Sequence, residues 1–274
     1  MPDGADRQRL PSVAPRLMPA YATLDDVVTG LAALEREFQA NGDRRAVFAT
    51  LYLVVSREMR DRVAKRAFLD PDWVHRYAVT FANFYRTALE AYDGGHGPDV
   101  PRAWRVCFDA AAAGTGLALQ DMLLGVNAHV NHDLALALDR ISIDPDRGRR
   151  RRDHDAVNAV LASVTERATA RLSALYAPGL AGLDDCAGEL DEMIGLFSLE
   201  VARDHAWESA VALANARTGI ERDLTTRVIA SRATVIARLL QAPSRSRTFT
   251  ALCRRLEQGL HWPTLLAGGE PAVQ

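Results

Sequence analysis

The chain has 274 residues, of which 48% are hydrophobic and 25% are charged, and its formal net charge at pH 7 is -2. This composition is sufficient for a packed core and excludes a wholly disordered chain. The near balance of charge argues against a nucleic-acid-binding protein, which normally carries a clear basic excess.

In the first half of the chain, turn residues separate three expected helices. Residues 1–20 contain prolines and charges but no apolar core, so we expect a disordered leader and no membrane anchor. Thr23 caps the first helix, which ends at Asn41. The second helix covers about 44–67, and Asp70-Pro71 begins a third that ends in a glycine-rich loop after Asp93.

The second half continues the helical pattern as far as about residue 260. The run of four arginines at 149–152 falls in a turn between helices, which we expect to be a solvated loop. No segment alternates strictly between apolar and polar residues, so no sheet is expected. The expected helices start near Pro101, Leu117, Asp153, Asp185, Ile220 and Ser244.

These elements predict an all-α fold. It is a single-domain bundle of about eight helices that spans residues 21–260, followed by a C-terminal coil at 261–274. The three cysteines, Cys107, Cys186 and Cys253, are too scattered for a disulfide framework or a thiolate metal site. Together with the absence of a signal peptide, this favours the cytoplasm.

The expected helix over 117–141 carries a dense polar cluster. At about 100° per residue, Asp121, His129, His132 and Asp133 fall on one face. Imidazole and carboxylate groups three or four residues apart could converge on one ion or one substrate, and they suit iron, manganese or zinc. Gly125, on the same face, leaves either room for a ligand or a close helix crossing.

A single helix cannot surround an ion, so further groups must come from facing helices. Candidates are Asp153, His154, Asp155 and Asn158 on the following helix, and Glu200, Arg203, Asp204, Trp207 and Glu208 on a later one. Alternatively, the cluster is a hydrogen-bonded network that holds the helices together. His132-Asp133 also matches the dipeptide of helical metal-dependent phosphohydrolases, but only as a dipeptide.

The central motif resembles that of a large, uncharacterised bacterial family. That family carries an Asn-Ala-His-Ile-Asn-x-Asp-Leu core, which stands here as residues 127–134, Asn-Ala-His-Val-Asn-His-Asp-Leu. Residues 48–56, 104–108, 155–158 and 202–207 also look like family features. The resemblance implies the fold and the position of a site but no known chemistry. His132 and Asp121 depart from the apolar residue and the histidine expected at their positions.

The sequence therefore predicts an enzyme that acts on a small molecule by hydrolysis, cyclisation or dehydration, with or without a divalent metal. His129, Asp133 and Arg203 are its expected catalytic residues, with Arg203 as partner for an anion or a carbonyl group. The competing hypothesis is a non-catalytic helical module that binds an apolar ligand or a partner.

We expect a monomer or homodimer without nucleic-acid or membrane partners. The expected substrate-binding residues are Asn127, Asn131, Trp207 and Tyr52, and the expected metal ligands are His129, His132, Asp133 and Asp121.

Overall fold

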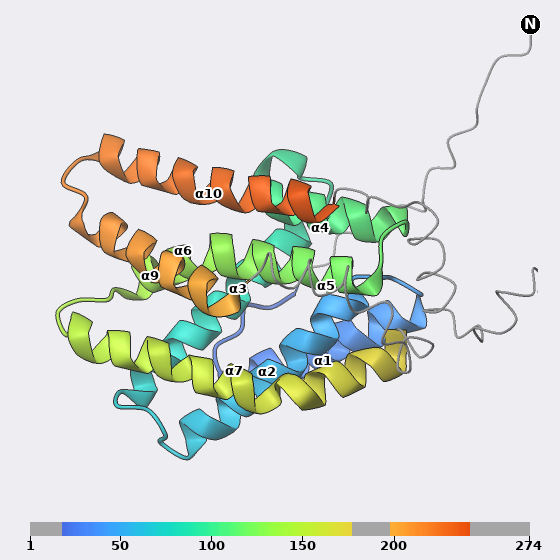
Figure 1. Ribbon diagram of the computed structural model, residues 1–274, viewed down its shortest axis with the longest axis horizontal. Helices are drawn as coiled ribbons and strands as arrows, with labels where there is room; N and C mark the ends of the chain where they lie inside the picture. The colour runs from blue at the N-terminus through green and yellow to red at the C-terminus, as the bar shows by residue number, and fades with distance from the viewer. Residues whose placement is uncertain (1–17, 177–197, 242–274) are drawn as a thin grey trace, which may run out of the picture.

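Helices make up 83% of the residues that the computed structural model describes, which are 18–176 and 198–241, and no strand occurs among these residues. The expected all-α bundle of about eight helices is confirmed (Figure 1). Most of the expected leader, the C-terminal coil and the helix near Ser244 lie outside the described residues. The α-helices are α1 Leu24–Ala40, α2 Ala46–Ala64, α3 Pro71–Asp93, α4 Arg102–Ala113, α5 Ala118–Asn127, α6 Leu134–Ile141, α7 Arg147–Tyr176, α9 Leu199–Asn215 and α10 Gly219–Gln241.

The start of α1 follows the prediction from sequence. The Thr23 side chain accepts a hydrogen bond from the Asp26 backbone N–H at 3.1 Å, and the Asp26 carboxylate accepts one from the Thr23 N–H at 2.9 Å. This reciprocal capping box satisfies backbone donors that the first turn of a helix leaves free.

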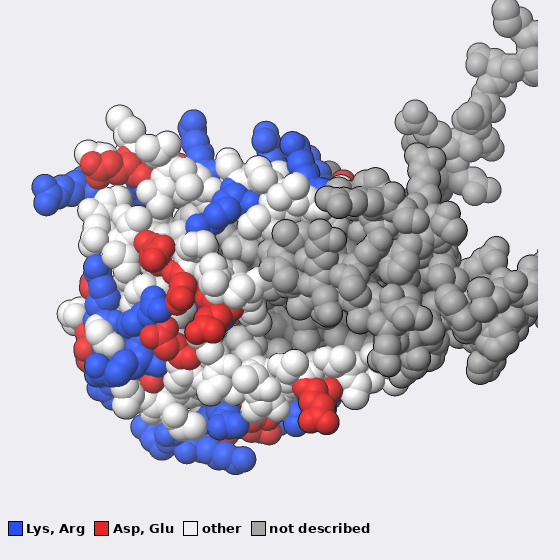
Figure 2. Space-filling view, in the orientation of Figure 1, with Lys and Arg blue, Asp and Glu red and all other residues white. Residues whose placement is uncertain are grey.

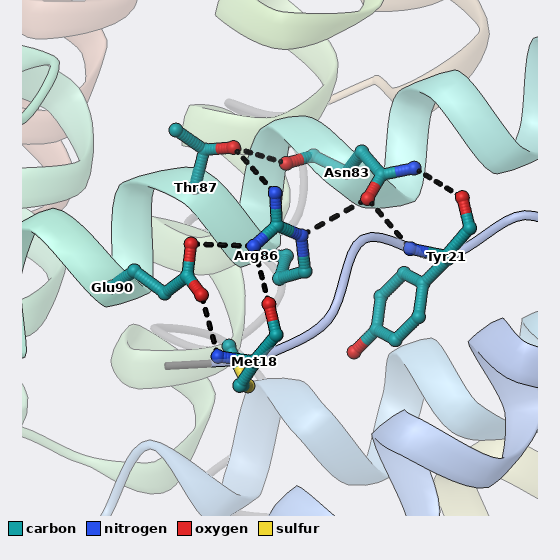
Figure 3. Close-up of polar contacts among 6 residues, drawn as sticks. All are labelled: Met18, Tyr21, Asn83, Arg86, Thr87 and Glu90. Atoms are coloured by element: carbon teal, nitrogen blue, oxygen red, sulfur yellow. Dashed lines mark hydrogen bonds and ion pairs between the residues drawn. The ribbon is translucent and has the colours of Figure 1, made fainter. Parts of the chain in front are cut away.

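The segment before α1 is held against α3 by a polar network (Figure 3). The Met18 backbone N–H donates to Glu90 at 2.6 Å, and the Asn83 side chain bonds both the N–H and the carbonyl of Tyr21. Arg86 donates to the Met18 carbonyl and to Glu90. These bonds join two segments more than 60 residues apart and fix the entry of the chain into α1.

The expected helix over 117–141 forms one continuous rod through the centre of the bundle. It consists of α5, a π-helical turn at Ala128–Asp133 (η2) and α6 (Figure 1). Helices α3, α4, α9 and α10 pack around η2, while α2 packs on α5. Two apolar clusters meet along this rod, one built mainly from α1 to α5 and α10, the other mainly from α3, α6, α7 and α9. The polar motif therefore lies in the middle of the core.

The four-arginine run was expected in a loop, and this prediction was wrong, because residues 149–152 lie in the first turns of α7. Arg151 pairs with Asp155 one turn later at 2.8 Å and with Asp204 of α9 at 2.5 Å. These carboxylates offset the repulsion within the run, and arginine itself has a high helix propensity.

The surface carries both signs of charge. On the face drawn in Figure 2, acidic and basic side chains are interspersed over the end of the bundle where α7, α9 and α10 begin or end. Among the helices described, none has the length and apolar character that crossing a membrane requires.

Candidate functional site

The π-helical turn places the central motif inside the core. All six residues of Ala128–Asp133 are buried, including both histidines and the aspartate. A π-helical turn within an α-helical rod is uncommon and frequently marks a functional site. Burial of three ionisable side chains in one turn also costs free energy unless they are hydrogen-bonded.

The Asp133 carboxylate is the centre of this cluster. Its Oδ2 accepts hydrogen bonds from the Trp104 indole Nε1 at 2.8 Å and from His129 Nδ1 at 3.0 Å, and its Oδ1 accepts one from His132 Nδ1 at 2.8 Å. Burial alone would raise the pKa of Asp133, but the hydrogen bonds from the two histidines outweigh it and lower the pKa. Asp133 is therefore an anion with three donors around it.

These contacts set the protonation state of His129. Because Nδ1 carries the hydrogen that is donated to Asp133, Nε2 of the neutral ring holds a lone pair. Nε2 is buried and has no hydrogen-bond partner among the described residues. Burial lowers the pKa of His129, against the opposing effect of Asp133, so the ring is neutral at pH 7.

Aromatic side chains hold the His129 ring in place. Phe81 stacks on it with ring centroids 3.5 Å apart and an interplanar angle of 6°. Tyr52 meets it edge to face at 4.6 Å, and Phe48 does so at 5.9 Å. The imidazole is thus fixed by packing as well as by its hydrogen bond to Asp133.

His129 lines a cavity of about 360 Å³ between α2, α3, α5, α7 and α9. This volume lies within the range of small-molecule sites, roughly 300–1,000 Å³. Apolar side chains form most of the wall, and Tyr52, Tyr77 and Arg203 are among the few polar groups that line it. An apolar cavity with a few convergent polar groups is the usual form of a small-molecule binding site.

Helix α9 belongs to the apolar cluster built mainly from α3, α6, α7 and α9, and its Arg203 lines the cavity. Its Nε donates to Asn158 at 2.7 Å, and its terminal nitrogens donate to the Tyr77 hydroxyl at 3.4 Å and to the His154 carbonyl. His154 in turn bonds the Arg203 carbonyl at 3.2 Å. The beginnings of α7 and α9, expected as facing elements, therefore meet at Arg203.

The other expected site residues lie away from this cavity. Asp121 is bonded to Arg44 at 2.5 Å. Asn127 donates to the Ala233 carbonyl of α10, and Asn131 donates to Asn127, so both join the rod to α10. Trp207 packs beside His154, with ring centroids 5.3 Å apart.

Of the four expected metal ligands, the structure brings together His129, His132 and Asp133 and places Asp121 beside Arg44. Among residues 18–176 and 198–241, no group of three or more His, Cys, Asp or Glu side chains is arranged to hold a metal ion. His129 directs Nδ1 at Oδ2 of Asp133, and His132 directs Nδ1 at Oδ1. A bound iron, manganese or zinc ion stays a prediction.

Three contributors to the site were not singled out by their sequence. Trp104 and Phe81 sit at core spacing on their helices, so they read as packing residues. Tyr77 likewise occupies a core position of α3. The sequence did contain one usable signal, since residues 104–108 are among the segments that were expected to be family features.

Comparison with known proteins places the chain in a family but assigns no activity. No curated protein and no solved structure matches the chain. The model of one family matches residues 24–243, which include the complete central rod, the cavity and Arg203. The chain therefore belongs to the family of unknown function DUF5995.

Proposed function

We propose that this protein is an enzyme that acts on a small, largely apolar molecule held in the cavity, with His129 as general base. The observation that carries the proposal is the state of His129, a cavity-lining residue whose buried Nε2 has no hydrogen-bond partner among the described residues and whose Nδ1 is held by Asp133. Asp133 would orient the ring and stabilise the imidazolium that forms when the ring takes a proton.

This arrangement suits reactions that begin with removal of a proton. It serves hydrolysis in which the base takes a proton from water, and cyclisation or dehydration in which the base takes a proton from the substrate. Because Nε2 is buried, a substrate in contact with it would replace little bulk water. The lowered pKa of His129 keeps the ring unprotonated at pH 7.

A substrate-independent test uses the elimination of a nitrobenzisoxazole, a small apolar probe. A base removes the ring C–H proton, the ring N–O bond breaks, and a coloured cyanophenolate is released. We expect the wild-type protein to catalyse this reaction and His129→Gln to lower the rate about 100-fold or more. The wild-type rate should rise with pH and reach its plateau below about pH 6.5, because burial lowers the pKa of His129.

The matched control is His205→Gln, since His205 is exposed on α9. It should retain the wild-type rate, and circular dichroism should show that both variants fold. Asp133→Asn provides a second test, because the amide no longer stabilises the imidazolium. If wild type and His129→Gln eliminate the probe at equal rates, the proposal is overturned. This holds both when these rates exceed the uncatalysed rate and when they equal it.

A second candidate function is the non-catalytic binding of an apolar ligand. The observation that favours it is the cavity wall, which is apolar over most of its surface. A probe that binds in the cavity but is converted equally by wild type and His129→Gln would favour this function over catalysis.

A further inference from the structure

Arg203 is a buried cation without a counter-ion among the described residues. Its side chain lies in the core, and the residue is 4% exposed. Arg44 and Arg45 are more exposed, yet the first pairs with Asp121 and the second with Asp43 and Asp93. A buried charge is costly unless an opposite charge compensates it. Among residues 18–176 and 198–241, no carboxylate pairs with Arg203 to compensate its charge.

Neutral groups hold the Arg203 guanidinium in position without compensating its charge. The Asn158 oxygen, the Tyr77 hydroxyl and the His154 carbonyl occupy three of its five N–H groups. His154 stays neutral as well, because burial and, secondly, the charge of Arg203 lower its pKa well below the ordinary value. The other two N–H groups have no acceptor in the part of the chain that the structure describes, and the side chain lines the cavity.

Two carboxylates close in sequence to these groups are paired with a different arginine. Asp204 follows Arg203 in the chain and Asp155 lies one turn before Asn158, but both bind Arg151 on the outside of the bundle. Figure 2 shows acidic and basic side chains interspersed over this end of the molecule. These acids balance the arginine run of α7 and not the buried charge.

One turn of α3 contacts both His129 and Arg203. Phe81 stacks on His129, and Tyr77, one turn earlier, contacts Arg203 through its hydroxyl. The rings of Tyr77 and Phe81 are stacked, with centroids 6.3 Å apart and an interplanar angle of 27°. A ligand that reaches both Arg203 and His129 must therefore pass along an apolar, aromatic wall.

We propose that the cavity binds an amphipathic monocarboxylic acid, with the carboxylate on Arg203 and the apolar part extending toward His129. This inference rests on the proposed function, because it names the class of substrate for the same cavity. The two N–H groups that find no acceptor among the described residues equal in number the two oxygens of one carboxylate. A phosphate would bring more charge than one guanidinium neutralises, and the remaining wall is mostly apolar.

Calorimetric titration tests this with decanoate and phenylbutyrate and with the neutral alcohols of the same length. We expect both acids to bind wild type more tightly than their alcohols. Arg203→Gln should weaken binding of the acids about 10- to 100-fold and leave binding of the alcohols unchanged. Arg203→Lys keeps the charge but loses the planar fork, so it should fall between the two.

The control is Arg167→Gln, because Arg167 is an exposed arginine on α7, the helix that also lines the cavity. Alcohol binding reports whether Arg203→Gln is folded. If the acids fail to bind, if they bind no better than the alcohols, or if Arg203→Gln weakens both equally, the inference is wrong. Calorimetry measures binding without turnover. If binding of the acids depends on Arg203 but His129 does not catalyse the elimination, only the proposed function is overturned.

Discussion

Trp104 and Trp73 are both fully buried, but their indole N–H groups donate to different acceptors. Trp104 donates to the Asp133 carboxylate at 2.8 Å, while Trp73 donates to the neutral Ser142 carbonyl at 3.1 Å. A hydrogen bond to a charged group contributes about 1.5–3 kcal/mol, against about 0.5–1.5 kcal/mol for a neutral one. This difference makes Trp104 part of the site as well as of the core.

We therefore expect Trp104→Phe to lower the free energy of unfolding by about 1 kcal/mol more than Trp73→Phe does. Both changes remove one N–H and a similar volume from a fully buried site, so the packing losses are comparable. Urea unfolding of the two variants at pH 7.5 measures the difference. An equal loss would mean that Asp133 does not depend on the indole donor.

His129 and His154 show how burial controls charge at the level of single residues. His129 and His154 each have one ring nitrogen bonded and one buried nitrogen without a partner among the described residues. Sequence identified His129 from its position four residues before Asp133. The bond of His154 to α9 depends on packing across 49 residues and was not predictable.

Among the helices, the crossing of α2 and α5 depends on Gly125. A Cβ at this position would lie 2.5 Å from the ring of Phe48, which lines the cavity and contacts His129. The sequence left open whether Gly125 makes room for a ligand or for a close helix crossing. The structure shows the second, with the Phe48 ring in the space.

We expect Gly125→Ala to lower the free energy of unfolding by about 1–3 kcal/mol, because the added methyl group must displace Phe48. Gly148→Ala is the matched control, since Gly148 is also helical but a Cβ there meets nothing within 4 Å. The control should be stabilised by up to about 1 kcal/mol through helix propensity. Thermal or urea unfolding distinguishes the two, and a neutral Gly125→Ala would show that Phe48 can move freely.

For the molecule as a whole, the buried histidines predict how stability depends on pH. Burial lowers the pKa of both His129 and His154 in the folded protein. In the unfolded chain each titrates near its ordinary value of about 6.5. Below that pH the unfolded state binds more protons than the folded state, so stability is fully present above about pH 6.5 and is lost as the pH falls.

We therefore expect the free energy of unfolding to decrease between pH 7 and pH 5, with a slope of up to about 1.4 kcal/mol per pH unit for each histidine. His154→Gln should make this slope shallower, while His205→Gln, on the exposed side of α9, should leave it unchanged. Denaturant unfolding at several pH values measures the slope. A stability that is constant over this range would contradict burial of neutral histidines.

The sequence by itself determined the helices and the relation of His129 to Asp133, because both depend on residues a few positions apart. Thr23 and Asp26 cap α1, and a spacing of four brings the imidazole to the carboxylate along one helix. Only the tertiary structure decided the rest. Trp104 reaches Asp133, Arg44 takes Asp121, and Asn158 meets Arg203. These contacts join residues 29 to 77 positions apart, whose pairing depends on how the helices pack and not on local periodicity.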